Sequence, residues 1–143
     1  MKKTMKINFS KTVLSILAIT VIMLAGCGKK ETKKEKIGFK ILIESNVDGI
    51  KLIAKEGCAF TELYFTLAQD KVEKFNQHGM VIEENSEIKS EENISNFLIT
   101  IKKSNEEIVL NGLKGTSWES LSFSCPELGC TQLIDENGMQ SMN

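Results

Sequence analysis

The side chains best suited to chemistry in this chain are its four cysteines and its single histidine. One of the cysteines, Cys58, would become a nucleophile only with a base close by, and His78 is the one histidine available. Nothing in the spacing of these two residues places them together. We therefore predict that Cys58 is a free thiol with a buried apolar role.

The segment CPELGC at residues 125–130 predicts a disulfide between Cys125 and Cys130. Pro126 and Gly129 favour a tight turn that brings the two sulfurs together. Closing so short a loop stabilises a fold by about 2 kcal/mol. A zinc site would need more nitrogen and sulfur ligands than one histidine and these cysteines supply, so no metal is expected.

Carboxylates are the other candidates for catalysis. Glu62, Glu73 and Glu119 would act as paired acids only if the fold brought them together, and so acidic a chain carries many such groups by chance. We predict no catalytic site and no cofactor.

The fourth cysteine, Cys27, follows a pattern typical of export. A run of 12 residues at 13–24 contains only two polar side chains, which is too short for a comfortable membrane span. Four lysines precede this run: Lys2, Lys3, Lys6 and Lys11.

The residues Leu24 to Cys27 (LAGC) resemble the lipobox of bacterial lipoproteins. This resemblance implies that residues 1–26 are a signal peptide and that Cys27 carries a diacylglyceryl group. Two acyl chains give stable membrane attachment. The implied location is the bacterial cell envelope, with the outer membrane favoured, and the implied partner is the membrane.

Charge separates the rest of the chain into two parts. All 18 basic residues are lysines, four of them in the signal, against 19 acidic residues. Residues 27–36 contain five lysines and read as a lipidated cysteine with a solvated tether. Residues 37–143 hold nine lysines and 17 acids, a net charge of −8. Without arginine or a basic patch, nucleic acid is excluded as a partner.

An internal duplication organises the domain at 37–143. Residues 39–80 match residues 97–139 at an offset of 58, with one inserted residue near the end. The matched positions include these pairs: Phe39 and Phe97, Ile41 and Ile99, Leu52 and Leu110, Gly57 and Gly115, Phe60 and Trp118, Phe65 and Phe123, Gly79 and Gly138.

Each copy has the patterns of β-strands. The segments FKILI at 39–43 and FLITI at 97–101 place apolar residues at every second position. Turns at 46–49 and 104–107 predict hairpins into second strands, and the alternation at 63–67 and 121–123 predicts a third strand with Phe65 and Phe123 facing inward. Gly57 and Gly115 suit a turn or bulge that needs a positive φ.

The end of each copy, at 71–80 and 130–139, fits either a fourth strand or a short helix ending at the glycine, and we favour the strand. Neither copy is large enough to bury a core alone. We predict a mainly β fold in which two tandem repeats of about three to four strands share one core, as a sandwich or barrel. The alternative is an α+β fold with a short helix ending each repeat. The acidic stretch at 83–92 would connect the copies.

The duplication also suggests structural roles for three candidate functional residues. His78 corresponds to Asn137, and both precede a glycine in the same expected turn. Phe60 and Trp118 are expected to be core or rim aromatics.

With its lipobox and duplicated unit, the whole chain resembles small lipoproteins of Bacteroidetes-type bacteria. This resemblance implies a location in the cell envelope and no particular activity. We predict a non-enzymatic binding or accessory module for an envelope protein, a glycan or a small ligand. One alternative is an inhibitor of a cationic envelope hydrolase, which is implied by the resemblance of small disulfide-bearing lipoproteins with acidic domains to periplasmic inhibitors of such enzymes. The other is a small hydrolase or thiol enzyme using Cys58 or His78.

Overall fold

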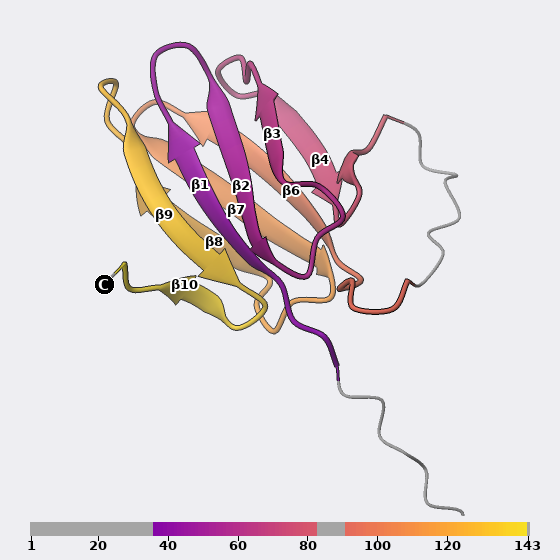
Figure 1. The fold of residues 1–143 in the computed structure, drawn as a ribbon. Helices are drawn as coiled ribbons and strands as arrows, with labels where there is room; N and C mark the ends of the chain where they lie inside the picture. The colour runs from indigo at the N-terminus through magenta and orange to yellow at the C-terminus, as the bar shows by residue number, and fades with distance from the viewer. Residues whose placement is uncertain (1–35, 83–90, 143) are drawn as a thin grey trace, which may run out of the picture. The chain divides into compact units, whose positions relative to one another are not determined.

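The computed structural model describes residues 36–82 and 91–142, and every regular element in these residues is a β-strand (Figure 1). Ten strands form two antiparallel five-stranded sheets that pack together as a sandwich and do not close into a barrel. The predicted β fold is confirmed. The helix alternative is wrong, because residues 72–76 and 130–135 pair in the sheets as strands.

Sheet A has the strand order β10-β9-β1-β2-β3. Its strands are β1 (Lys40–Ser45), β2 (Ile50–Glu56), β3 (Glu62–Phe65), β9 (Cys130–Asp135) and β10 (Gly138–Gln140). Sheet B has the order β5-β4-β6-β7-β8. Its strands are β4 (Val72–Asn76), β5 (Gly79–Met80), β6 (Leu98–Ser104), β7 (Glu107–Lys114) and β8 (Ser120–Ser124).

The two copies fold to corresponding strands, β1–β5 in the first and β6–β10 in the second, so each copy has five strands where we expected three or four. The C-terminal hairpins are exchanged between the copies. The hairpin β4–β5 pairs with β6 of the second copy, and β9–β10 pairs with β1 of the first. The register is the same in both places, since Ile41 faces Ile134 as Ile99 faces Phe75.

A bulge near the start of each copy also repeats. The pairing shifts between Lys40 and Ile41 in the first copy and between Leu98 and Ile99 in the second. Gly57 and Gly115 lie beside these bulges with φ of 70° and 75°, which confirms the predicted positive φ. A Cβ at Gly57 would collide with the Gly38 carbonyl oxygen, and one at Gly115 with the Asn96 carbonyl oxygen.

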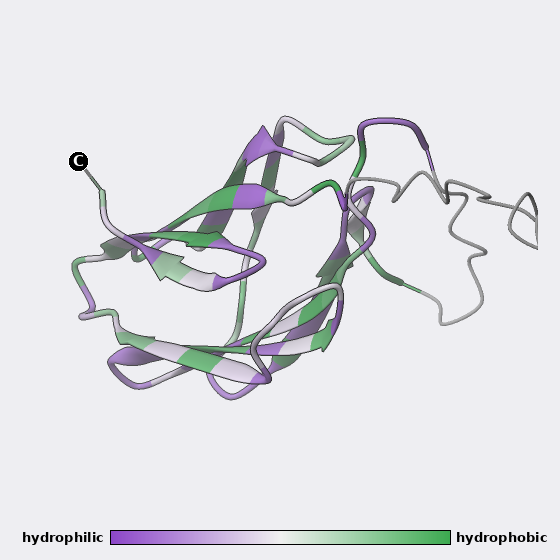
Figure 2. Cartoon of the chain, turned by 90° about the horizontal axis from the view of Figure 1, so that it is seen from below, coloured by the Kyte–Doolittle hydropathy of each residue, from purple (hydrophilic) through white to green (hydrophobic). Residues whose placement is uncertain are grey.

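The shared core lies between the two sheets. Hydrophobic and hydrophilic residues alternate along many of the strands, as expected where one side of a strand is buried (Figure 2). Phe39 and Phe97, which are equivalent in the two copies, meet in this core with their ring centroids 4.4 Å apart. The predicted inward positions of Phe65 and Phe123 are confirmed, although both side chains are only partly buried. The fully buried aliphatic side chains are Ile41, Ile43, Ile50, Leu52, Ile99, Ile101, Ile108, Leu110 and Ile134.

Several sequence predictions fall outside the described residues. These are the signal at 1–26, Cys27, all but the last residue of the tether, and positions 83–90 of the connector. Within the described ranges, no helix long and apolar enough to cross a membrane was found.

Candidate functional site

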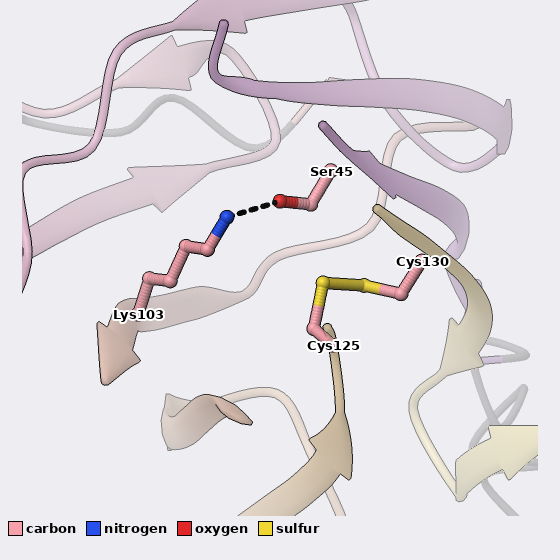
Figure 3. The surroundings of a disulfide bond; sticks show 4 residues. All are labelled: Ser45, Lys103, Cys125 and Cys130. Atoms are coloured by element: carbon pink, nitrogen blue, oxygen red, sulfur yellow. Dashed lines mark hydrogen bonds between the residues drawn. A yellow bond between two sulfur atoms is a disulfide. The ribbon is translucent and has the colours of Figure 1, made fainter. Parts of the chain in front are cut away.

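The predicted disulfide between Cys125 and Cys130 is formed, with the two Cα atoms 4.9 Å apart. It joins the end of β8 to the start of β9 (Figure 3). Cys125 is fully buried and takes the place that Leu67 has in the first copy. The disulfide is therefore part of the core at one end of the sandwich.

A serine and a lysine meet beside this disulfide. Lys103 of β6 reaches across the sandwich, and its Nζ donates a hydrogen bond of 3.2 Å to Oγ of Ser45 in β1 (Figure 3). Serine–lysine pairs serve some hydrolases, in which the lysine acts as a base. Here the lysine donates, and Ser45 is only 5 % exposed. The geometry therefore supports a structural role, in which Ser45 satisfies a partly buried ammonium group.

Cys58 is a free thiol packed against the core, as predicted. Its Sγ lies 3.6 Å from the carbonyl oxygen of Glu56. Burial raises the pKa of the Cys58 thiol to about 12, so the reactive thiolate is disfavoured at neutral pH. This environment is the reverse of the one that activates a cysteine nucleophile.

His78 lies exposed in the turn between β4 and β5, as the duplication predicted. Its backbone N–H donates to Oδ1 of Asn76 at 2.8 Å, and Asn137 makes the matching bond to Asp135 at 2.7 Å. The two turns are thus built alike, and His78 holds a turn position.

The three candidate carboxylates lie on different parts of the fold. Glu62 is in β3 of sheet A, Glu73 is in β4 of sheet B, and Glu119 precedes β8. Among the described residues, no group of three or more histidine, cysteine or carboxylate side chains is placed to hold a metal.

Phe60 and Trp118 are partly buried against the core, which confirms their expected role. The Trp118 ring nitrogen Nε1 donates to the carbonyl oxygen of Asp135 at 3.0 Å. Trp118 therefore ties the segment before β8 to the β9–β10 hairpin and has its polar atom occupied.

A pocket of about 350 Å³ opens at the disulfide end of sheet A. Four side chains from four neighbouring strands form a row across it, in the order Tyr64, Lys51, Glu44 and Thr131. The disulfide loop supplies the rim through Leu128 and Gly129. The pocket thus combines an aromatic ring, both signs of charge and an apolar loop residue.

Two glycines allow this pocket to form. A Cβ at Gly49 would lie 2.7 Å from the Phe65 carbonyl oxygen and 3.1 Å from the Tyr64 hydroxyl. Gly129 has φ of 117°, and a Cβ there would collide with the Ser45 carbonyl oxygen. Larger residues would therefore push the Tyr64 ring and the disulfide loop away from the β1–β2 hairpin.

Next to the pocket, the outer face of sheet A carries an apolar row. Leu133, Leu42 and Ile53 are cross-strand neighbours on the central strands β9, β1 and β2, and all three are partly exposed. Outward positions on a solvated sheet are normally polar. We call the pocket together with this row the A-face site.

The equivalent row on sheet B is polar. It consists of Lys74, Thr100 and Asn111, and the Asn111 amide donates to the Thr100 hydroxyl at 3.3 Å. Sheet B also has outward apolar residues, but their cross-strand neighbours are polar. Lys102 separates Val72 from Val109, and Leu98 lies between Asn76 and Lys114. The outer face of sheet B therefore has no apolar row of this kind across its central strands.

The loops at this end of the molecule differ in the same way. In the loops that border sheet A, the apolar residues Val47 and Leu128 are 77 % and 94 % exposed. Asn105 is the counterpart of Val47. Gln69 is the counterpart of Leu128 when the two positive-φ residues Asp70 and Gly129 are aligned. Gln69 donates a hydrogen bond of 2.9 Å to Asn105. Polar side chains that satisfy one another in one half are replaced by exposed apolar ones in the other.

The A-face site was not among our sequence predictions. The pattern that reveals it is present in the duplication, because Leu42 breaks the alternation at a position where the second copy has Thr100. No family model, curated protein or solved structure matches this chain.

Proposed function

We propose that this chain is a lipid-anchored protein of the bacterial cell envelope, attached through Cys27, and that it is a non-enzymatic binding or accessory module. The A-face site is its binding surface. The observation that carries the proposal is the apolar row of Leu42, Ile53 and Leu133, which stands where sheet B has three polar residues.

The arrangement of charge favours another protein as the ligand. Ion pairs flank the apolar row along the strands, Lys40 with Glu56 at 3.2 Å and Lys51 with Glu62 at 3.0 Å. An apolar centre with a polar rim is the usual anatomy of a protein interface. Because the two lysines are paired with glutamates, the rim is close to neutral. This balance supports a neutral partner surface over a strongly cationic hydrolase.

The state of the candidate nucleophiles supports binding over catalysis. Burial holds the Cys58 thiol in its protonated form at neutral pH, and His78 lies exposed in a turn. Ser45 is buried and accepts its hydrogen bond from Lys103.

The anchor is tested by labelling cells with a fatty acid analogue. The wild-type chain should incorporate the label and partition into detergent, whereas Cys27→Ala should do neither. A Cys27→Ala chain that still carries the label would overturn the lipid anchor.

The binding surface is tested by exchanging side chains between the two faces. The full chain, tagged at its C-terminus, is used to capture partners from detergent-solubilised envelopes. The variant Leu42→Thr/Ile53→Asn gives sheet A the residues of sheet B and should lose its partner. The matched control Thr100→Leu/Asn111→Ile should keep it.

Both variants should remain folded, which thermal melting checks, since none of the exchanged side chains belongs to the core cluster between the sheets. If the two variants captured equal amounts of the partner, the A-face site would be refuted as the binding surface. The proposed lipid anchor would not be affected by that result. Capture of glycan in place of protein would refute the protein partner.

A further inference from the structure

The two sheets leave four edge strands, and one of them, β8, lacks the features that usually protect an edge. Edges are protected by shortness, charge, proline or bulges. β5 and β10 have two and three residues, and β3 has four residues that include Glu62. β8 has five residues, SLSFS, with no charge and no proline.

Hydrogen bonds at both ends of β8 show which of its backbone groups face outward. Gly112 N–H donates to the Glu119 carbonyl at 3.0 Å, and Cys125 N–H donates to the Glu106 carbonyl at 2.6 Å. Along an antiparallel pair of strands, residues whose backbone groups bond to the neighbouring strand alternate with residues whose backbone groups point away from it. Residues 121 and 123 therefore bond to β7, and the backbone groups of Ser120, Ser122 and Ser124 point away from it.

No other strand in the described part of the chain pairs along this outward side. All three serines are exposed. The partly buried side chains of Leu121 and Phe123 pack against the core from one side and remain open at the edge.

We propose that β8 pairs antiparallel with β8 of a second copy of this chain, around a two-fold axis at Ser122. The sequence of the strand is complementary to itself in this arrangement. Ser122 faces Ser122, Leu121 faces Phe123, and Ser120 faces Ser124. Apolar residues meet apolar residues, hydroxyls meet hydroxyls, and no like charges are opposed.

This pairing joins the two B sheets into one continuous sheet and covers the apolar side chains left open at each edge. A two-fold interface uses the same patch on both copies, which closes the assembly at a dimer. The arrangement leaves the A-face site free, because that site lies on the other sheet, and it does not depend on the proposed function.

The equivalent edge, β3, is the less suitable one. Ser122 corresponds to Tyr64, and pairing β3 with itself around Tyr64 would place the Glu62 carboxylate opposite Thr66. Glu62 is also held by its ion pair with Lys51. A charged residue on an edge opposes the addition of another strand.

Cross-linking in cells that express the full chain tests the proposal. In a directly opposed hydrogen-bonded pair the Cα atoms are about 5.5 Å apart, which suits a disulfide. Ser122→Cys, made in a Cys58→Thr background, should give a covalent dimer on a non-reducing gel after mild oxidation. Tyr64→Cys in the same background is the matched control and should stay monomeric.

Absence of the Ser122→Cys dimer, or equal dimer from Tyr64→Cys, would overturn the proposal. A cross-linked product of Ser122→Cys whose mass shows a different protein would refute the proposal that β8 pairs with a second copy of this chain.

A second variant separates the interface from the fold. Ser122→Pro removes an N–H that faces outward and leaves the bonds to β7 in place. Sedimentation equilibrium in density-matched detergent should show the dimer constant weakened about tenfold or more, with the melting temperature close to the wild-type value. An unchanged dimer in folded Ser122→Pro protein would also overturn the proposal.

Discussion

The outer faces of sheets A and B are built on matching backbones and carry different side chains. Strand order, register, bulges and positive-φ glycines repeat between the two halves. The row Leu133, Leu42, Ile53 on one face corresponds to Lys74, Thr100, Asn111 on the other. The buried positions of the two halves are apolar with few exceptions, whereas this outward row differs in kind. The divergence is therefore the better guide to function.

The hydrogen bonds between segments repeat as closely as the strands. Ala59 N–H donates to the Gln77 carbonyl, and Ser117 N–H donates to the Glu136 carbonyl. The Gln77 side chain accepts from Phe97 N–H, as the Glu136 side chain accepts from Phe39 N–H. The two backbone bonds therefore join each C-terminal hairpin to the rest of its own copy. The two side-chain bonds join the same hairpin to the other copy.

The largest expected effect breaks the shared core and tests whether the halves are equivalent there. Phe39→Ala and Phe97→Ala each remove a fully buried ring and should each lower the free energy of unfolding by about 3–5 kcal/mol. Phe65→Ala and Phe123→Ala should cost less, because these rings are only partly buried. Urea unfolding is the measurement. All four variants should unfold in one transition, and two separate transitions would show that the halves are independent.

A smaller effect is expected from removing the disulfide, which only the second half has. Cys125→Leu/Cys130→Lys installs the residues found at Leu67 and Lys71 of the first half. The loss should be about 2 kcal/mol, because the cross-link no longer restricts the unfolded chain.

Unfolding with and without reductant measures this difference. Wild-type protein and the control Cys58→Thr should both be weakened by reductant, and the double variant should not respond. A double variant that responds like the wild type would contradict the assignment of the disulfide.

The third difference between the halves is Cys58, whose equivalent in the second copy is Thr116. Burial raises the pKa of the Cys58 thiol from 9.0 to about 12. The folded state therefore holds its proton more tightly than the unfolded state, and this contribution to stability is lost as the pH rises from 9 toward 12. Alkylation of folded protein should be slow at pH 8 and should become fast after denaturation. Rapid alkylation of the folded chain at pH 8 would contradict the buried thiol.

The smallest effect concerns Asp70, which has Gly129 as its counterpart. Hydrogen bonds from Ser104 and Lys102 lower the pKa of the exposed Asp70 carboxyl below its ordinary value. Its contribution to stability is present above that ordinary value and is lost as the pH falls through the lowered pKa. Titration followed by NMR should show the Asp70 pKa rising in Ser104→Ala. No change in that variant would assign the shift to Lys102 alone.

Much of the fold followed from local patterns. The strands at 39–43 and 97–101 and the turns at 46–49 and 104–107 are where the alternation and the turn residues placed them. The disulfide followed from a short loop with a proline and a glycine. The strands β5 and β10 were missed, because two or three residues are too few to show a period.

The exchange of hairpins could not be predicted. Alternation determines which side of a strand is buried, but not which strand lies beside it. The A-face site was within reach, since comparing the copies position by position would have singled out Leu42 and Ile53. The separation of Glu62, Glu73 and Glu119 could be learned only from the fold, as their positions depend on which strands are neighbours.

The exchange of hairpins also sets the order in which this chain can fold. The meanders β1–β2–β3 and β6–β7–β8 are local and can form early, but Ile41 must find Ile134, more than 90 residues away. Contacts so distant in sequence slow folding, because a long loop must close before they form. The first sheet is completed by the last strands of the chain. Sheet A therefore stays incomplete until β9 and β10 are available to pair with β1.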